Sequence, residues 1–149
     1  MQLSVTETSP QEWQYISEGK YSIVLCYVGK SHPQFSGTVL RLKKTGPGID
    51  VELEDMTVAF QRSVIERLIP SEYLPRLSTV EVEKSWLENV AVLCDEMRPL
   101  KRRQSSQIDA SVERAILATD LVGGATVSVE IKVCYSRCFS MHVVIRLTA

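Results

Sequence analysis

The chain has 149 residues, of which 44% are hydrophobic and 23% charged, and its formal net charge is -1. This length suits one ordinary domain, whose core is large enough to need no disulfide or metal ion. The nearly neutral charge creates no overall field that would attract nucleic acid or an anionic membrane, so we expect neither as a partner.

The N-terminus and the cysteines bear on the cellular compartment. Residues 2–7 have neither the basic region nor the apolar region of a secretory signal, and no run reaches the roughly 20 apolar residues that span a bilayer. The four cysteines, at positions 26, 94, 134 and 138, have no paired spacing. We therefore expect free thiols in the nucleus or cytoplasm, and a monomer.

Three runs rich in aromatic and β-branched residues predict three antiparallel strands near the N-terminus. They cover residues 12–18, 21–28 and 38–43. Gly19 and Lys20 separate the first two runs. In the third run, alternation places Leu40 and Leu42 on one face of the strand and Arg41 on the other.

Two helices are predicted to follow these strands. In the first, apolar residues recur every four positions up to Pro70, at Met56, Phe60, Val64 and Leu68. In the second, Ser85 and Glu88 have the spacing of a capping box, and apolar residues keep helical spacing up to Arg98.

Two further strands are predicted after the polar stretch 101–107. Residues 115–118 form a short apolar run typical of a buried strand, and a glycine pair at 123–124 marks a turn. From 126 to 133 apolar and polar residues alternate strictly, with Glu130 and Lys132 on the polar face. The predicted fold class is α+β, an antiparallel sheet with two or more helices.

Two positions near the first hairpin could hold a phosphate. Gly19 lies between two strands, where a glycine lets backbone amides approach a phosphate closely; a plain turn is the alternative. Arg41 lies on the third strand, where protein kinases carry a lysine that contacts nucleotide phosphates. Its planar guanidinium would offer two donors at once, and a solvated charge at a sheet edge is the alternative.

A basic cluster follows the second predicted helix. It comprises Arg98, Lys101, Arg102 and Arg103, which we place beside Glu130 and Lys132. Such a cluster suits a densely phosphorylated small molecule, but a nuclear-localisation patch or a solvated loop fits the same spacing. A non-catalytic module that binds polyphosphates or a protein partner through residues 98–103 is therefore the alternative function.

Residues near the C-terminus have a spacing that suggests zinc. Cys134, Cys138 and His142 recur at intervals of four and could share one face of a helix or strand. No fourth ligand is apparent, and cysteines usually behave as small hydrophobic residues. We therefore predict no metal site in this chain.

Taken in order, several motifs between residues 12 and 132 resemble the N-terminal half of the inositol-pentakisphosphate 2-kinases. An ordered set of motifs is more specific than any one of them. The motifs are Glu12-Trp13 leading to Glu18-Gly19, Ser22-Ile23-Val24-Leu25, Gly37 with Val39-Leu40-Arg41-Leu42, Arg98-Pro99-x-x-Arg102, and Ser128-Val129-Glu130-Ile131-Lys132.

The resemblance implies an ATP-dependent kinase, assisted by Mg²⁺, that phosphorylates the 2-hydroxyl of inositol pentakisphosphate to give inositol hexakisphosphate. It implies ATP-binding roles for Gly19, Lys20, Arg41, Thr119, Asp120 and Leu121. Gly19 would belong to the loop that covers the phosphates, and residues 119–121 would form the hinge beside the adenine. It also implies that Arg102, Lys132 and Glu130 contact the substrate.

The sequence departs from the family after Lys132. The family continues there into proline, a second lysine and a cysteine-glycine-phenylalanine stretch, whereas Val133, Cys134 and Tyr135 follow here. From Val133 onward the chain has no Asp or Glu, the residues that phosphoryl transfer needs to hold magnesium. We therefore expect an ATP-binding lobe at 1–132, a non-matching tail at 133–149 from truncation or splicing, magnesium ligands and catalytic residues in an absent C-terminal lobe, and no turnover by this chain alone.

Overall fold

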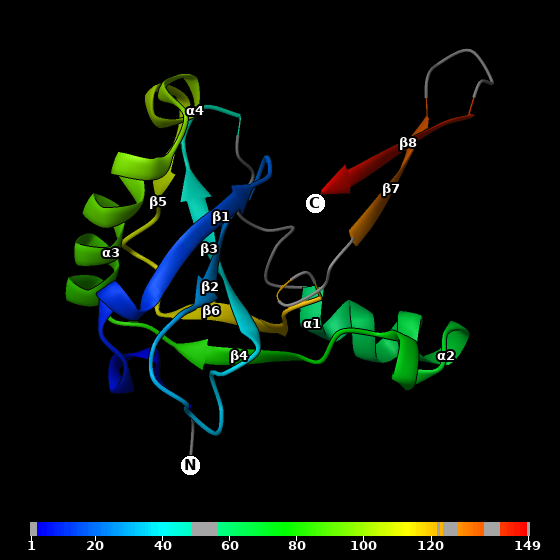
Figure 1. Ribbon diagram of the computed structural model, residues 1–149, viewed down its shortest axis with the longest axis horizontal. Helices are drawn as coiled ribbons and strands as arrows, with labels where there is room; N and C mark the ends of the chain where they lie inside the picture. Colours follow the sequence, from blue (N-terminus) through cyan, green and yellow to red (C-terminus); the bar gives the residue numbers. More distant parts are fainter. Residues whose placement is uncertain (1–2, 49–56, 122, 124–127, 136–140, 149) are drawn as a thin grey trace.

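The computed structural model describes residues 3–48, 57–121, 123, 128–135 and 141–148. Their centre is an antiparallel sheet with the strand order β1-β2-β3-β6-β4, and β5 pairs with the end of β3 (Figure 1). The strands are β1 (Trp13–Glu18), β2 (Ser22–Tyr27), β3 (Thr38–Thr45), β4 (Leu77–Glu81), β5 (Gln107–Ile108) and β6 (Arg114–Thr119). Helices accompany the sheet, so the predicted α+β class is confirmed.

Helix α3 (Lys84–Met97) covers one face of the sheet and forms the core with it. Trp86 from α3 meets Trp13 from β1 edge to face, with ring centroids 6.4 Å apart, an arrangement that aromatic pairs prefer. Both indole nitrogens donate to Thr8, at 2.8 Å to its hydroxyl and 3.0 Å to its carbonyl. The N-terminal 3₁₀ turns, Val5–Glu7 and Pro10–Glu12, are thereby fixed to the core.

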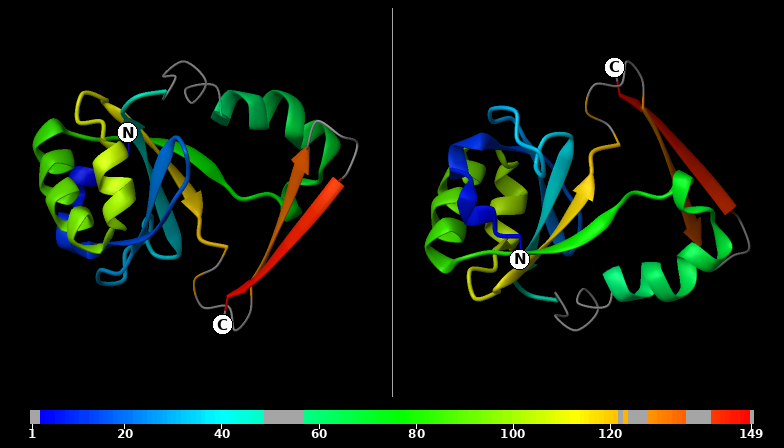
Figure 2. Two further views of the ribbon diagram at one scale, coloured as in Figure 1. Left: turned by 90° about the horizontal axis from the view of Figure 1, so that it is seen from above. Right: turned by 90° about the horizontal axis from the view of Figure 1, so that it is seen from below.

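A helical segment lies on the other side of the sheet from α3 (Figure 2). It consists of α1 (Thr57–Phe60), the π-helical stretch Gln61–Ile65 and α2 (Glu66–Leu68), and it ends before Pro70 as predicted. Among the residues whose spacing predicted it, Phe60, Val64 and Leu68 are 52%, 37% and 76% exposed, and Met56 lies outside the described residues. The repeat of four fits the wider π turns better than an ideal α-helix.

The C-terminal part forms a separate hairpin of β7 (Ser128–Tyr135) and β8 (Met141–Thr148). The strand predicted from the alternation at 126–133 is confirmed from Ser128 onward, whereas β8 was not predicted. No helix in the described ranges is both long and apolar enough to cross a bilayer.

The predicted capping box at Ser85 and Glu88 is wrong. Helix α3 begins at Lys84, and Glu83 occupies the N-cap position without a side-chain hydrogen bond there. In this register the large Trp86 side chain is buried, with 5% of its surface exposed. Lys84 lies within the helix and its Nζ atom is 3.9 Å from the Glu88 carboxylate, an i,i+4 pair that a capping box with Ser85 would not give.

The polar stretch 101–107, for which no element was predicted, contains two. Helix α4 (Leu100–Ser105) follows directly after Pro99, and β5 comes next. Strand β4 was also not predicted, because polar residues interrupt its apolar pattern and only Val80 is fully buried. These elements complete the frame around the candidate site.

Candidate functional site

The sheet face opposite α3 carries the first candidate residue. On β3, Leu40 points into the core, so alternation turns Arg41 to the other face. Arg41 lies between Val24 of β2 and Ile116 of β6 in the sheet register. It is half-buried, and its Nη2 atom donates to the Ser22 hydroxyl at 3.4 Å.

A pocket of about 260 Å³ lies beside Arg41. Its lining comprises Arg41, Lys43, Val58, Thr79, Arg114, Ala115 and Ile116. The apolar members lower the local dielectric, which strengthens the attraction between the basic members and an anion. Arg114 was missed in the sequence, although alternation back from Ile116 along β6 could have placed it on this face.

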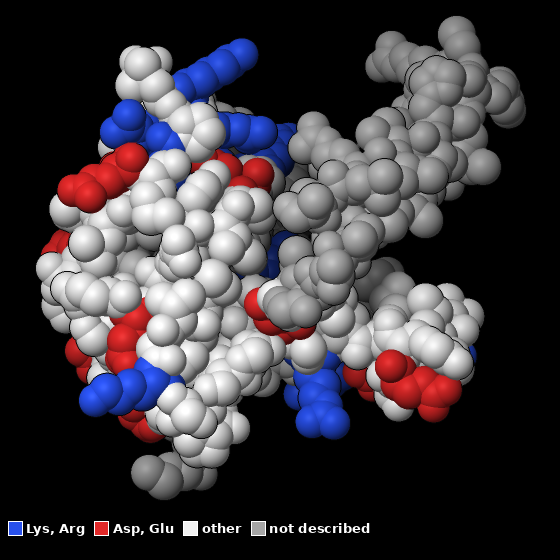
Figure 3. Space-filling view, viewed as in Figure 1, with Lys and Arg blue, Asp and Glu red and all other residues white. Residues whose placement is uncertain are grey.

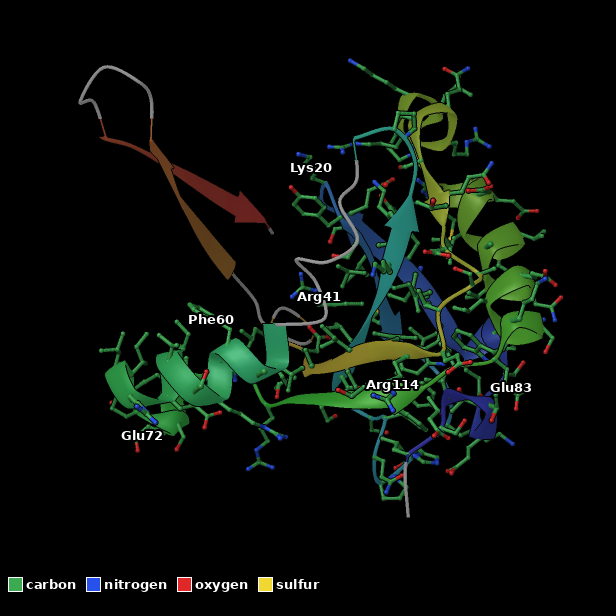
Figure 4. All side chains as sticks on the ribbon, turned by 180° about the vertical axis from the view of Figure 1, so that it is seen from behind. Lys20, Arg41, Phe60, Glu72, Glu83 and Arg114 are labelled. Atoms are coloured by element: carbon green, nitrogen blue, oxygen red, sulfur yellow. The ribbon has the colours of Figure 1, made fainter. Side chains whose placement is uncertain are left out.

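The turn between β1 and β2 holds Gly19 and Lys20. The Gly19 N–H donates to the Ser22 carbonyl at 2.9 Å, so it closes the turn. A side chain at position 19 would meet no atom within 4 Å, and Gly19 does not have a positive φ. Neither backbone conformation nor packing therefore requires glycine here. Figure 4 shows Lys20 and Arg41 pointing to the same side of the sheet.

A buried charge cluster of Glu18, Lys44 and Arg98 lies beneath this turn, and Asp95, whose side chain is 47% exposed, pairs with Arg98 at its edge. The Glu18 carboxylate accepts from Lys44 Nζ at 2.7 Å and from Arg98 Nε and Nη2 at 3.1 and 3.0 Å. The side chains of Glu18, Lys44 and Arg98 are at most 2% exposed. Lys44 also donates to the Gly19 carbonyl at 3.0 Å, so the cluster holds the turn directly.

The surroundings of Glu18 shift its acidity. Burial opposes ionisation, but the hydrogen bonds from Arg98 and Lys44, together with their charges, outweigh it and lower the pKa of Glu18. Burial likewise opposes the charged form of Arg98, but the Glu18 and Asp95 carboxylates raise its pKa. Both shifts favour the charged forms, so Glu18 and Arg98 form an ion pair near neutral pH.

The predicted basic cluster at 98–103 is divided by the fold. Arg98 is 3% exposed and belongs to the buried charge cluster, whereas Lys101 and Arg102 are exposed on α4. Arg103 is half-buried, and its Nε atom has no hydrogen-bond partner among the described residues. Figure 3 shows Lys and Arg side chains gathered where α4 lies. An anion at α4 can therefore reach Lys101 and Arg102, but not Arg98.

The three predicted hinge residues follow or end β6. Thr119 and Leu121 line another pocket of about 640 Å³, and Arg41 is not among the residues that line it. Thr119 also accepts from the Arg76 N–H at 3.1 Å through its hydroxyl. The Asp120 N–H donates to the Gly37 carbonyl at 2.9 Å. The structure thus anchors this segment to β3 and β4, and it separates Thr119 and Leu121 from the Arg41 pocket.

The remaining candidates lie on the C-terminal hairpin. In the β7–β8 register, Glu130 pairs with Arg146 and Lys132 with Val144; their side chains lie outside the described part of the chain. Cys134 pairs with His142, and Cys138 also lies outside the described residues. Within the described residues, no group of three or more His, Cys, Asp and Glu side chains could hold a metal ion.

The buried charge cluster predicts a large effect of Glu18→Gln on stability. The change leaves Lys44 and Arg98 buried without their anion, so we expect the free energy of unfolding to fall by about 3–5 kcal/mol at pH 7. Urea denaturation measures this change. The matched control is Glu88→Gln, since Glu88 is 58% exposed and 3.9 Å from Lys84, and we expect less than about 0.5 kcal/mol there.

The same comparison has a pH signature. Because the folded-state pKa of Glu18 lies below its ordinary value of 4.5, its stabilisation is complete above that pH and is lost as the pH falls below it. The Glu18→Gln variant should therefore lose less stability than the unmodified chain when the pH falls from about 5 to about 3, the range around the ordinary pKa of a glutamate. Equal acid sensitivity in both proteins would contradict the ion pairing described above.

Comparison with known proteins connects this architecture to one family. The family model described as inositol-pentakisphosphate 2-kinase matches residues 15–133. Proteins of that name from two strains of Cryptococcus neoformans var. neoformans serotype D are 29% identical over 136 residues, which cover 85% of this chain and 33% of theirs. The Arabidopsis thaliana protein of that name is 26% identical over 169 residues, covering 89% of this chain and 37% of its own.

The chain spans about a third of the length of these curated relatives. Its antiparallel sheet with few helices is consistent with the N-terminal lobe of a kinase-like fold. The family match extends from within β1 into β7 and therefore includes the turn, the Arg41 pocket and α4. The chain belongs to the inositol-pentakisphosphate 2-kinase family.

Proposed function

We propose that this chain supplies the nucleotide-binding part of an ATP-dependent kinase that phosphorylates inositol 1,3,4,5,6-pentakisphosphate at the 2-hydroxyl, giving inositol hexakisphosphate. The observation that carries the proposal is the position of Arg41, which lines a basic pocket on the sheet face opposite α3. The relatives are named inositol-pentakisphosphate 2-kinases, which supports the substrate class.

The nucleotide phosphates would lie between the Gly19–Lys20 turn and the Arg41 pocket. Arg41 can offer a planar pair of donors, and Arg114 adds a second guanidinium to the same pocket. Gly19 has no structural need to be glycine, which is expected if a ligand approaches its backbone closely. We assign residues 119–121 to the adenine side of the nucleotide; the N–H groups of Thr119 and Asp120 already donate to the Arg76 and Gly37 carbonyls.

The inositol phosphates would contact α4. Lys101 and Arg102 are exposed there and can neutralise phosphate charge. We assign Lys132 and Glu130 of β7 to the same substrate, following the family motif in which they lie. Phosphoryl transfer itself depends on positioning and on metal ions that neutralise charge. We assign no magnesium ligand and no catalytic base to the described residues.

Replacing Arg41 tests the nucleotide site. Arg41→Met keeps the length of the side chain but removes its charged donors, so we expect ATP affinity to fall about tenfold or more. Isothermal titration of ATP measures the change, and Arg62→Met, at an exposed position on the π-helical stretch, is the control. Equal affinities in the two variants would remove Arg41 from the site. Equal binding of ATP and tripolyphosphate would favour the polyphosphate-binding module instead.

Replacing Gly19 separates function from folding. Since a methyl group at position 19 meets no neighbour, Gly19→Ala should leave stability unchanged or raise it by about 0.4–1 kcal/mol. ATP affinity should nevertheless fall, because the methyl group occupies the space that a phosphate needs. Thermal unfolding and ATP titration on the same sample check both parts. Unchanged ATP affinity would show that the turn does not approach the nucleotide.

We expect turnover to need more of the family's length than this chain spans, which is about a third of the relatives. We expect no inositol hexakisphosphate from this chain with ATP, magnesium and inositol pentakisphosphate, and product from a version extended beyond Lys132 by a longer transcript. Chromatography of the inositol phosphates measures both. Product from the shorter chain would overturn the requirement, and product from neither would overturn the proposed reaction.

A further inference from the structure

The proposed nucleotide and substrate regions meet at one buried group of charges. We propose that Glu18 and Arg98 are positioning residues that couple nucleotide binding at the Gly19–Lys20 turn to inositol phosphate binding at α4. This inference rests on the proposed function. Its physical basis is that the Glu18 carboxylate pairs with Lys44, which binds the Gly19 carbonyl, and also with Arg98, which binds the Ser106 carbonyl.

On the nucleotide side, the cluster contacts the Gly19–Lys20 turn through a hydrogen bond to its backbone. Glu18 directly precedes Gly19, and Lys44 Nζ joins the Glu18 carboxylate at 2.7 Å to the Gly19 carbonyl at 3.0 Å. The Lys44 N–H also donates to the Tyr21 carbonyl at 2.9 Å. The pairing of Glu18 with Lys44 therefore adds a contact from the cluster to the turn, which its own backbone hydrogen bond closes.

On the substrate side, Arg98 donates hydrogen bonds to carbonyl groups at the end of α4. While its Nε and Nη2 atoms bind Glu18, Nη2 also donates to the Ser106 carbonyl at 2.9 Å and to the Arg102 carbonyl at 3.3 Å. A helix of six residues is marginal by itself. The exposed cations of α4 are therefore held in place by the guanidinium that also binds Glu18.

A second contact makes this link close. Gly46, just after β3, has φ of 153°, and a Cβ atom there would lie 2.7 Å from the Ser105 carbonyl. Glycine thus lets the end of β3, which carries Lys44, approach the end of α4 directly. If the end of α4 shifts toward β3, the Ser105 carbonyl presses directly on the segment that follows Lys44.

Coupling follows if the cluster has one well-paired arrangement that both ligands favour. Pairs at most 2% exposed lose much of their attraction when distances change. A ligand that holds the turn thereby favours the paired arrangement, and so favours the position of α4 that the second ligand needs. Linkage requires the effect to be reciprocal, and typical couplings are about 5–150-fold.

The test measures the affinity of a non-hydrolysable ATP analogue with and without saturating inositol pentakisphosphate, and the reverse titration. At about 0.15 M salt, repulsion between the two anions is screened beyond roughly 8 Å. In the unmodified chain we expect each ligand to lower the dissociation constant of the other by about fivefold or more. Independent binding of both ligands would overturn the coupling and leave the proposed function standing. Binding of neither ligand would overturn the proposed function itself.

Arg98→Lys identifies the residue responsible. Lysine keeps the charge but lacks the fork that spans Glu18 and Ser106. We therefore expect each ligand still to bind, while the coupling falls below about twofold, which is under the typical range. The control is Val90→Ala, which opens a cavity in the core of α3 away from the cluster and should keep the coupling. Coupling retained in Arg98→Lys, or lost equally in the control, would overturn the assignment.

Hydrogen exchange of α4 in the unmodified chain tests the coupling without depending on whether these variants fold. The N–H groups of Arg102 and Ser106 donate to the Pro99 and Arg102 carbonyls, so their hydrogen exchange reports opening of α4. We expect the ATP analogue alone to slow this exchange at least about fivefold, matching the coupling. Unchanged exchange at analogue saturation would overturn the proposal.

Discussion

The Glu18 carboxylate sets the conditions on which much of this lobe depends. Two cations are removed from water around it, and either one left alone would cost several kcal/mol. Three segments far apart in the sequence, the end of β1, the end of β3 and the chain after α3, must therefore come together for the charges to be satisfied. The turn and α4 are attached to these same segments.

The two faces of the sheet differ in the side chains that they carry. On one face, α3 and the paired tryptophans bury apolar side chains against β2 and β3. On the other, the Arg41 pocket keeps basic groups beside apolar walls, an arrangement that stabilises little but attracts anions. Strand alternation produces both faces from one sequence, because each strand turns successive residues in opposite directions.

Local patterns predicted the elements that have clean periodicity and missed those that depend on distant contacts. The alternation around Leu40 and Arg41 was sufficient to place both correctly. The role of Arg98 was not predictable, because its partner Glu18 lies 80 positions away and the local sequence makes it one of several surface cations. Helix α4 was missed for the same reason: Arg98, which lies outside the helix, donates to the Arg102 carbonyl within it and to the Ser106 carbonyl just after it.

The division of the Arg98-Pro99-x-x-Arg102 motif affects how natural variation in this family should be interpreted. The two arginines are four positions apart, yet one lies in the interior and the other in solvent. Loss of the inner guanidinium would raise the unfolded population and expose the chain to cellular proteolysis, so the cell would contain less protein. Loss of the outer one would leave protein abundance normal, and under the proposed function it would weaken only the contact with the inositol phosphate. A single motif in an alignment can thus record two independent selective pressures.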